Sequence, residues 1–151
     1  MSHFAVAVFM TDNKQSLENL LLPYRETPEN FDPKWDWYRI GGRWQGELLL
    51  KDNKKGKRGK PGLLMEMSDG YDAAFASDID FTAMYKRDKT FHTYAVITPD
   101  GKWHAPGEIW WFGFSSSSKR AERKWRRGYY EHFIEPAIKN NWYMVIVDCH
   151  I

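Results

Sequence analysis

The chain begins and ends with an apolar run, and these two runs constrain its fold more than any other feature. Phe4 to Met10 consists of Phe, Ala, Val and Met, and Trp142 to Ile151 is nearly as apolar. Short β-branched runs with little polar alternation are typical of strands that are buried on both faces. We therefore expect both strands in the centre of one sheet, where they could pair side by side.

The chain between the two runs predicts three helices. Gln15 to Leu22 has its leucines on one side and is ended by Pro23, which cannot continue a helix. Asp78 to Lys86 predicts a second helix, because acidic residues favour the first turn. A long helix follows Ser115 to Ser118, whose hydroxyls suit an N-cap, and continues to about Lys139. Its buried stripe is predicted from apolar residues that recur every four positions: Ala121, Trp125, Tyr129 and Phe133.

Further strands are predicted between these helices. Thr98-Pro99-Asp100-Gly101 is a strong turn signal, because Pro presets φ and Gly accepts a positive one. The expected strands are, in chain order, Trp44 to Leu50, Leu63 to Met67, Phe91 to Ile97, Lys102 to Ala105 and Glu108 to Phe114. This order of elements predicts an α+β fold, with helices packed on one face of a mostly antiparallel sheet.

The composition indicates a single domain over residues 1–151. Hydrophobic residues make up 42% of the chain and aromatic residues 17%, enough for a core without disulfides. The 22 basic and 20 acidic residues are too balanced for a protein that coats nucleic acid. No run approaches the ~20 apolar residues of a membrane span. Cys149 is the one cysteine, which fits a reducing cytoplasm. We expect a cytoplasmic protein without membrane or nucleic-acid partners, and its oligomeric state stays open.

The ten residues from Trp35 to Trp44 combine four large aromatic rings, two arginines and two adjacent glycines. In an extended chain, Trp35, Trp37 and Arg39 share one face. The indoles could stack on a flat ring, at about 1–3 kcal/mol per base, and the arginines could bind phosphate or carboxylate. The predicted ligand-binding residues are Trp35, Trp37, Tyr38, Arg39, Arg43 and Trp44. A kinked core strand whose arginines pair with nearby acids is the alternative.

The last strand carries polar residues on an otherwise apolar face. Met144, Ile146, Asp148 and His150 share this face on a two-residue period. His3 would meet His150 if the first and last strands are antiparallel neighbours. A carboxylate beside an imidazole can orient a general base or help to bind metal, so His3, Asp148 and His150 are the candidate catalytic residues. Their spacing matches no zinc pattern, so we predict no metal and no cofactor. A sheet-end pair bonded to the backbone is the alternative.

Several other groups could carry a function. Lys51 to Lys60 and Lys119 to Arg127 are basic runs that could bind phosphate, although such faces are usually only solvated. Ser115 to Ser118 could bind an anion through backbone N–H groups. Trp110-Trp111-Phe112 could contact a partner protein. Cys149 is predicted to be an inert thiol whose apolar neighbours raise its pKa. The remaining histidines are scattered and are not predicted as ligands: His92, His104 and His132.

The aromatic segment and the two ends of the chain carry a family resemblance. The core Trp-Asp-Trp-Tyr-x-Ile-Gly-Gly-Arg-Trp at 35–44 occurs with Met-Ser-His-Phe at 1–4 and Val-Asp-Cys-His-Ile at 147–151. In these features the chain resembles a family of small uncharacterised bacteriophage proteins. The resemblance implies a phage origin and the cytoplasm of an infected bacterium, and it assigns no catalytic residue. Small phage accessory proteins often counter host defences by sequestering or degrading nucleotide signals, or by binding a host protein.

We therefore predict a phage accessory protein, of an anti-defence type, that binds a small phosphate-bearing ligand of nucleotide type through its Trp and Arg residues. Two alternatives stay open. One is a phosphate-ester hydrolase that uses His3, Asp148 and His150, and the other is an inhibitor that binds a host protein. Whether the chain is an enzyme also stays open, because a binding protein needs no acid–base machinery.

Overall fold

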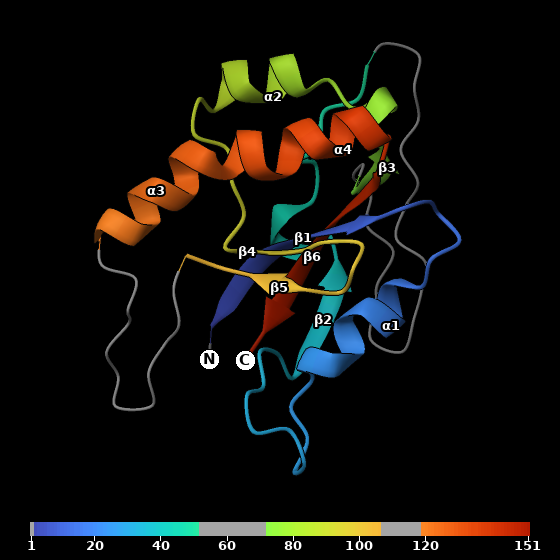
Figure 1. Cartoon of the computed structure of the whole chain (residues 1–151), viewed down its shortest axis with the longest axis vertical. Helices are drawn as coiled ribbons and strands as arrows, with labels where there is room; N and C mark the ends of the chain where they lie inside the picture. Colours follow the sequence, from blue (N-terminus) through green and yellow to red (C-terminus); the bar gives the residue numbers. More distant parts are fainter. Residues whose placement is uncertain (1, 52–71, 107–118) are drawn as a thin grey trace.

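The two apolar runs pair with each other at the centre of the sheet (Figure 1). In the computed structural model, which describes residues 2–51, 72–106 and 119–151, strand β1 (His3–Met10) runs antiparallel to β6 (Tyr143–His150) along its whole length. The register places His3 opposite His150. The prediction of two central, adjacent strands is confirmed. Their pairing brings both ends of the chain together.

The remaining strands extend this pair on both sides. The order is β2-β6-β1-β4-β5, and β3 pairs with β6 beyond β2. Strands β2 (Trp37–Ile40) and β3 (Ala73–Phe75) run antiparallel to successive stretches of β6. Strand β4 (Ala95–Ile97) runs parallel to β1, and β5 (Trp103–His104) returns antiparallel to β4. The sheet is therefore mixed and mostly antiparallel, and the fold is α+β as predicted.

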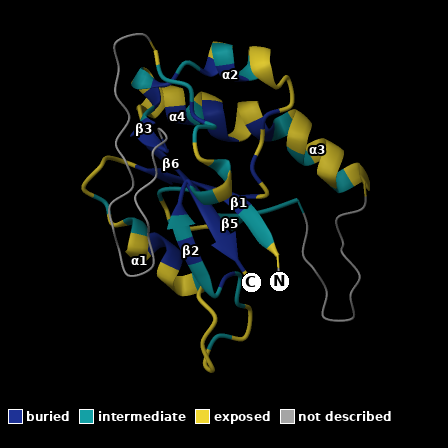
Figure 2. Ribbon diagram, turned by 180° about the vertical axis from the view of Figure 1, so that it is seen from behind, coloured by how far each residue is buried: buried dark blue, intermediate teal, exposed yellow. Residues whose placement is uncertain are grey.

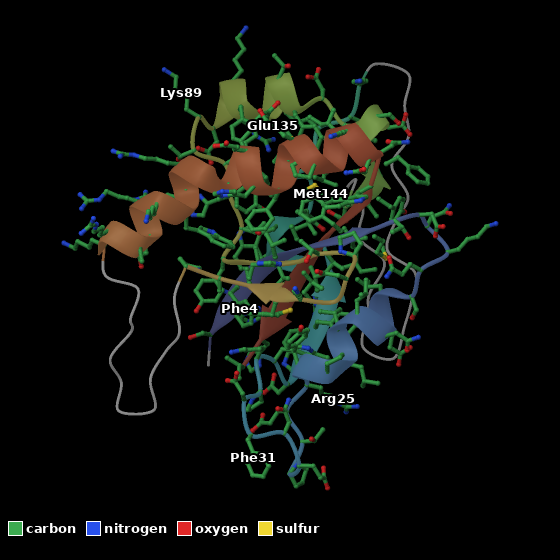
Figure 3. The ribbon with its side chains drawn as sticks, viewed as in Figure 1. Phe4, Arg25, Phe31, Lys89, Glu135 and Met144 are labelled. Atoms are coloured by element: carbon green, nitrogen blue, oxygen red, sulfur yellow. The ribbon has the colours of Figure 1, made fainter. Side chains whose placement is uncertain are left out.

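One face of the sheet is covered by the helices that follow β3 and β5. Helices α2 (Phe81–Arg87), α3 (Lys119–Tyr129) and α4 (Glu135–Asn140) lie together above it (Figure 1). A π-helical turn, η4 (Tyr130–Ile134), joins α3 to α4. Met144 points from β6 toward this layer (Figure 3). We call the apolar residues between the sheet and these helices the helix-side core, which includes Phe9, Met84, Tyr129, Phe133, Met144 and Ile146.

The other face of the sheet is covered by the first helix, so the prediction that all helices pack on one face is wrong. Helix α1 (Leu17–Leu21) is followed by a 3₁₀ turn, η1 (Leu22–Tyr24). The tight turn after β1 returns the chain beneath the sheet, where Leu20 and Leu21 are buried. We call this layer the second core, which includes Val6, Val8, Leu21, Trp35, Tyr38, Val147 and Cys149. Figure 2 shows buried residues running along β1 and β6.

Two predicted strands differ from the structure. No strand occupies Trp44 to Leu50, because the glycines at 41, 42 and 46 all have positive φ and the chain forms a 3₁₀ turn, η2 (Gly42–Trp44), instead. The strand expected over Phe91 to Ile97 is reduced to β4, and the short strand β3 was not predicted. The predicted helices near Gln15 to Leu22 and Asp78 to Lys86 are confirmed as α1 and α2, with Asp80 capping α2.

Several predictions fall outside the described residues. They are the strands over Leu63 to Met67 and Glu108 to Phe114, the basic run from Lys51 to Lys60 apart from Lys51 itself, the Ser115 to Ser118 anion site and the Trp110-Trp111-Phe112 contact surface. In the part of the chain that the structure describes, no helix has the length and apolar character needed to cross a bilayer.

Candidate active site

The site lies where the helix-side face of the sheet changes from apolar to polar. Along β6, Met144 and Ile146 point into the helix-side core, and the next two side chains on that face are Asp148 and His150. Both polar residues are almost fully buried. Because a buried polar group must be hydrogen-bonded, the partners of these two side chains decide what the site can do.

Asp148 holds the imidazole of His3. The Nδ1–H of His3 donates to Asp148 Oδ1 over 2.8 Å, across the β1–β6 ladder. The second carboxylate oxygen, Oδ2, accepts the backbone N–H of Arg43 at 3.0 Å. The Asp148 side chain is only 2% exposed. Both oxygens are therefore fixed, and the position of the His3 ring is set by a carboxylate that has little freedom to move.

A second carboxylate holds the other imidazole. The Nδ1–H of His150 donates to Asp36 Oδ1 over 2.7 Å. Asp36 precedes β2, whose first residue, Trp37, lies opposite His150 in the sheet. The Asp36 side chain is 37% exposed, whereas that of His150 is 7% exposed. The His150 imidazole is thus sheltered from water, whereas the Asp36 carboxylate remains in contact with water.

The two imidazoles and one indole pack as a group of three rings. Trp37 stacks on His150 with ring centroids 5.0 Å apart and planes 18° from parallel. The His3 ring meets both edge-on, at 5.4 Å from Trp37 and 5.1 Å from His150. The guanidinium of Arg39 lies over the Trp37 ring at 5.4 Å. A cation over an aromatic face is favourable, so Arg39 is held beside the histidines.

The hydrogen bonds leave one nitrogen of each imidazole for chemistry. Because Nδ1–H is engaged by a carboxylate, the neutral ring presents Nε2 as an acceptor. Among the described residues, neither Nε2 has a hydrogen-bond partner. A neutral imidazole with an oriented Nε2 can take a proton, and its protonated form can return one. The site therefore has two groups suited to proton transfer.

Two glycines allow the chain to wrap around the buried carboxylates. A Cβ at Gly42 would lie less than 3.0 Å from the Asp148 carboxylate, and one at Gly41 would be as close to the carboxylate of Asp72. Asp72 is fully buried, and its Oδ1 accepts the backbone N–H of Gly46 at 3.1 Å. The glycine pair thus makes room for two side chains of the protein itself.

The aromatic segment is divided between the core and the site. Trp35 is 3% exposed, donates its indole N–H to the Leu21 carbonyl at 2.9 Å and meets Tyr38 edge-on in the second core. The prediction that Trp35 shares a face with Trp37 and Arg39 is wrong. Pairing of β2 with β6 starts only at Trp37, and Trp35 instead bridges to Arg25. No clamp of two indoles forms.

The other predicted ligand-binding residues lie in different surroundings. Arg43 has an exposed side chain and joins the site through its backbone N–H. Trp44 is half-buried against the helix-side core. Sequence reasoning missed Asp36 and Asp72 as parts of the site. Asp36 could have been found from its place inside the aromatic motif, whereas Asp72 offered no sequence signal, because its contacts to Gly41 and Gly46 are tertiary.

A cavity lies beside the histidines on the same face of the sheet. It has a volume of about 140 Å³, and its lining includes Ala5, Ile146, Trp44 and Phe91. Ala5 is opposite Asp148 in the ladder and follows His3 by two residues. The cavity and the two carboxylate–imidazole pairs are therefore neighbours along β1.

The cysteine and the other three histidines do not take part in the two carboxylate–imidazole pairs. Cys149 points into the second core, and burial raises the pKa of its thiol well above the usual value, as predicted. His104 bonds to Thr98, and burial lowers its pKa. His132 is exposed on η4. His92 bonds through Nδ1 to the Thr90 carbonyl, meets the Tyr129 ring edge-on and lines the cavity.

The described residues contain no group of three or more His, Cys, Asp or Glu side chains arranged to hold a metal ion. His3 and His150 turn their Nδ1 atoms toward different carboxylates. Comparison of the chain with protein-family models, with curated proteins and with solved structures finds no match.

Proposed function

We propose that the chain is a phosphate-ester hydrolase for a substrate of nucleotide type, with His3 and His150 as its proton-transfer groups. The observation that carries this proposal is the pair of imidazoles. Their ring centroids are 5.1 Å apart, and each ring is held at Nδ1 by its own carboxylate. In the proposed complex, the Nε2 atoms of both rings face one bound phosphate group. Phosphoryl transfer needs one proton acceptor for the nucleophile and one donor for the leaving group.

The proposed step uses both imidazoles at once. One neutral Nε2 takes a proton from a water molecule as its oxygen forms a bond to phosphorus. The protonated Nε2 of the other ring gives its proton to the ester oxygen as the phosphorus–oxygen bond breaks. The products are an alcohol and a phosphate, and the two rings exchange their protonation states, which solvent then restores. Arg39 supplies positive charge beside the rings, where negative charge builds up on phosphate oxygens.

This arrangement favours hydrolysis over simple sequestration of a ligand. A sequestering clamp would need two indoles on one face, and Trp35 instead lies in the second core. Orienting Nε2 with a buried carboxylate is costly in a pure binding site, because the Asp148 charge must be desolvated. In the phage setting that the family resemblance implies, the enzyme would degrade a nucleotide signal of the bacterial host.

The test is turnover by the purified chain of 151 residues. We expect release of para-nitrophenol from bis(para-nitrophenyl) phosphate, and of monophosphates from a panel of linear and cyclic dinucleotides, followed by phosphorus NMR. His3→Gln and His150→Gln should each lower kcat by about 10²–10⁴, the usual contribution of one general acid or base. The matched control is His132→Gln, which removes an exposed imidazole outside the site.

Two results would overturn the proposal. One is turnover that survives in both histidine variants. The other is a nucleotide that binds at the site and is recovered unchanged after long incubation, which would instead support the sequestering role that the sequence predicts.

A further inference from the structure

We infer that the cavity beside Ala5 is the base subsite of this enzyme, and that it takes a cytosine-type ring, a single six-membered ring with an exocyclic amino group. The inference rests on the proposed function, because it assumes that the phosphate lies at His3 and His150. It specifies two properties that the histidines alone do not: which nucleotide is bound, and which end of that nucleotide lies in the cavity.

The position of the cavity suits one small ligand that also reaches the histidines. Ala5 and His3 point to the same face of β1, two residues apart, which corresponds to about 7 Å at 3.4 Å per residue. Ile146 is related to Asp148 in the same way on β6. A nucleotide with its phosphate at the rings can therefore place its base over Ala5 and Ile146.

The walls of the cavity suit a flat ring of limited size. Trp44 and Phe91 supply aromatic surface, and stacking of a base is worth about 1–3 kcal/mol. Phe91 is held in place by edge contacts to Tyr85 at 5.9 Å and Tyr129 at 6.1 Å. The volume of 140 Å³ is close to the roughly 150 Å³ of an engineered cavity that accepts one benzene ring. A single ring therefore fits better than a fused purine.

Three of the side chains that line the cavity present acceptors: Asp88, Glu47 and His92. Asp88 Oδ1 accepts hydrogen bonds from the backbone N–H and the hydroxyl of Thr90, and Oδ2 can therefore accept one from a ligand. Glu47 adds a second carboxylate, which pairs with Arg87 at 3.3 Å. His92 donates Nδ1–H to the Thr90 carbonyl, so its neutral ring presents Nε2 as a third acceptor.

This polarity sets both the orientation and the identity of the ring. Carboxylates repel phosphate, so the phosphate must lie at the imidazole end and the base in the cavity. Glu and Asp are the usual acceptors for the N4 amino group of cytosine. Uracil carries a carbonyl oxygen at that position, which would face the carboxylates without a donor. The cavity should therefore discriminate between these two pyrimidines.

The inference is tested first without turnover, by calorimetry of the full chain with cytidine, uridine and adenosine. We expect cytidine to bind at least tenfold more tightly than the other two. Asp88→Asn should abolish that preference, because the amide offers an N–H₂ donor where the carboxylate accepted. Asp88 is exposed and its Oδ1 bonds to Thr90 are retained in the variant, so folding should be unaffected. The matched control is Asp32→Asn, an exposed carboxylate that pairs with Lys34.

Turnover provides the second measurement. The Asp88→Asn enzyme should show a raised KM for cytidine esters with kcat unchanged. Cytidine binding without any hydrolysis would keep the subsite and overturn the proposed function. Hydrolysis with equal KM values for cytidine and uridine esters, unchanged in Asp88→Asn, would overturn the subsite and keep the proposed function. Failure of all three nucleosides to bind, together with equal KM values, would likewise overturn the subsite.

Discussion

Trp35 and Trp37 are two residues apart, yet one belongs to the core and the other to the candidate active site. Trp35 lies in the second core, where its indole N–H is bonded to a carbonyl and its ring packs edge-on against Tyr38. Trp37 lies on the other face, half-buried, and stacks on His150. The difference arises because strand pairing with β6 begins at Trp37. Residue type alone therefore does not identify the residues of the site. The contacts that each ring makes identify them.

Removal of each indole in turn tests whether the two rings have these different roles. Trp35→Ala should lower the free energy of unfolding by about 3–5 kcal/mol, the usual cost of truncating a large buried ring. Trp37→Ala should lower it by less than about 2 kcal/mol, because the ring is only half-buried, yet should reduce turnover at least tenfold. Urea denaturation followed by circular dichroism gives the first quantity, and kcat of the folded variant gives the second. Equal losses of stability would contradict the assignment of the two rings.

The glycines after β2 provide a second, smaller contrast. Gly42 and Gly46 both have positive φ, at 55° and 80°, so alanine is strained at each by roughly 1–2 kcal/mol. At Gly46 nothing lies within 4 Å of the added Cβ, whereas at Gly42 it meets the Asp148 carboxylate. We expect Gly42→Ala to cost about 2–3 kcal/mol of stability and Gly46→Ala about 1 kcal/mol.

The difference between the two alanine variants isolates the contact with Asp148, because backbone strain is common to both. Gly42→Ala should also displace the carboxylate from His3 and lower turnover, while Gly46→Ala should leave turnover intact. Two variants with the same melting temperature and the same kcat would show that the turn does not position Asp148.

The sequence predicted the centre of the fold and only part of the site. The terminal apolar runs identified β1 and β6 as central, and their alternation placed Asp148 and His150 on one face beside His3. The carboxylate that orients His150 was not identified, although Asp36 lies inside the aromatic motif, because the motif alone does not show which imidazole this residue contacts. The predicted clamp of Trp35 and Trp37 failed for a related reason. Two-residue alternation applies only within a paired strand, and sequence does not mark where pairing begins.

The two carboxylate–imidazole pairs differ in exposure, and this gives the smallest predicted effect. Asp148→Asn and Asp36→Asn should both lower kcat, since an amide N–H₂ facing Nδ1 favours the tautomer that carries its proton on Nε2, which can no longer act as a base. We expect the loss at Asp148 to exceed the loss at Asp36 by about tenfold, or 1.4 kcal/mol. Asp36 is 37% exposed, so water can partly replace it, whereas Asp148 is 2% exposed.

Nitrogen-15 NMR of the imidazoles distinguishes positioning from a merely structural role. In the unmodified protein, both rings should carry the proton on Nδ1. In Asp148→Asn only His3 should change tautomer, and in Asp36→Asn only His150 should, with KM little altered in either. A loss of kcat without a tautomer change would mean that these carboxylates stabilise the structure of the sheet end and do not control the tautomers of the two imidazoles. Equal losses in the two variants would mean that burial of Asp148 adds nothing to its control of His3.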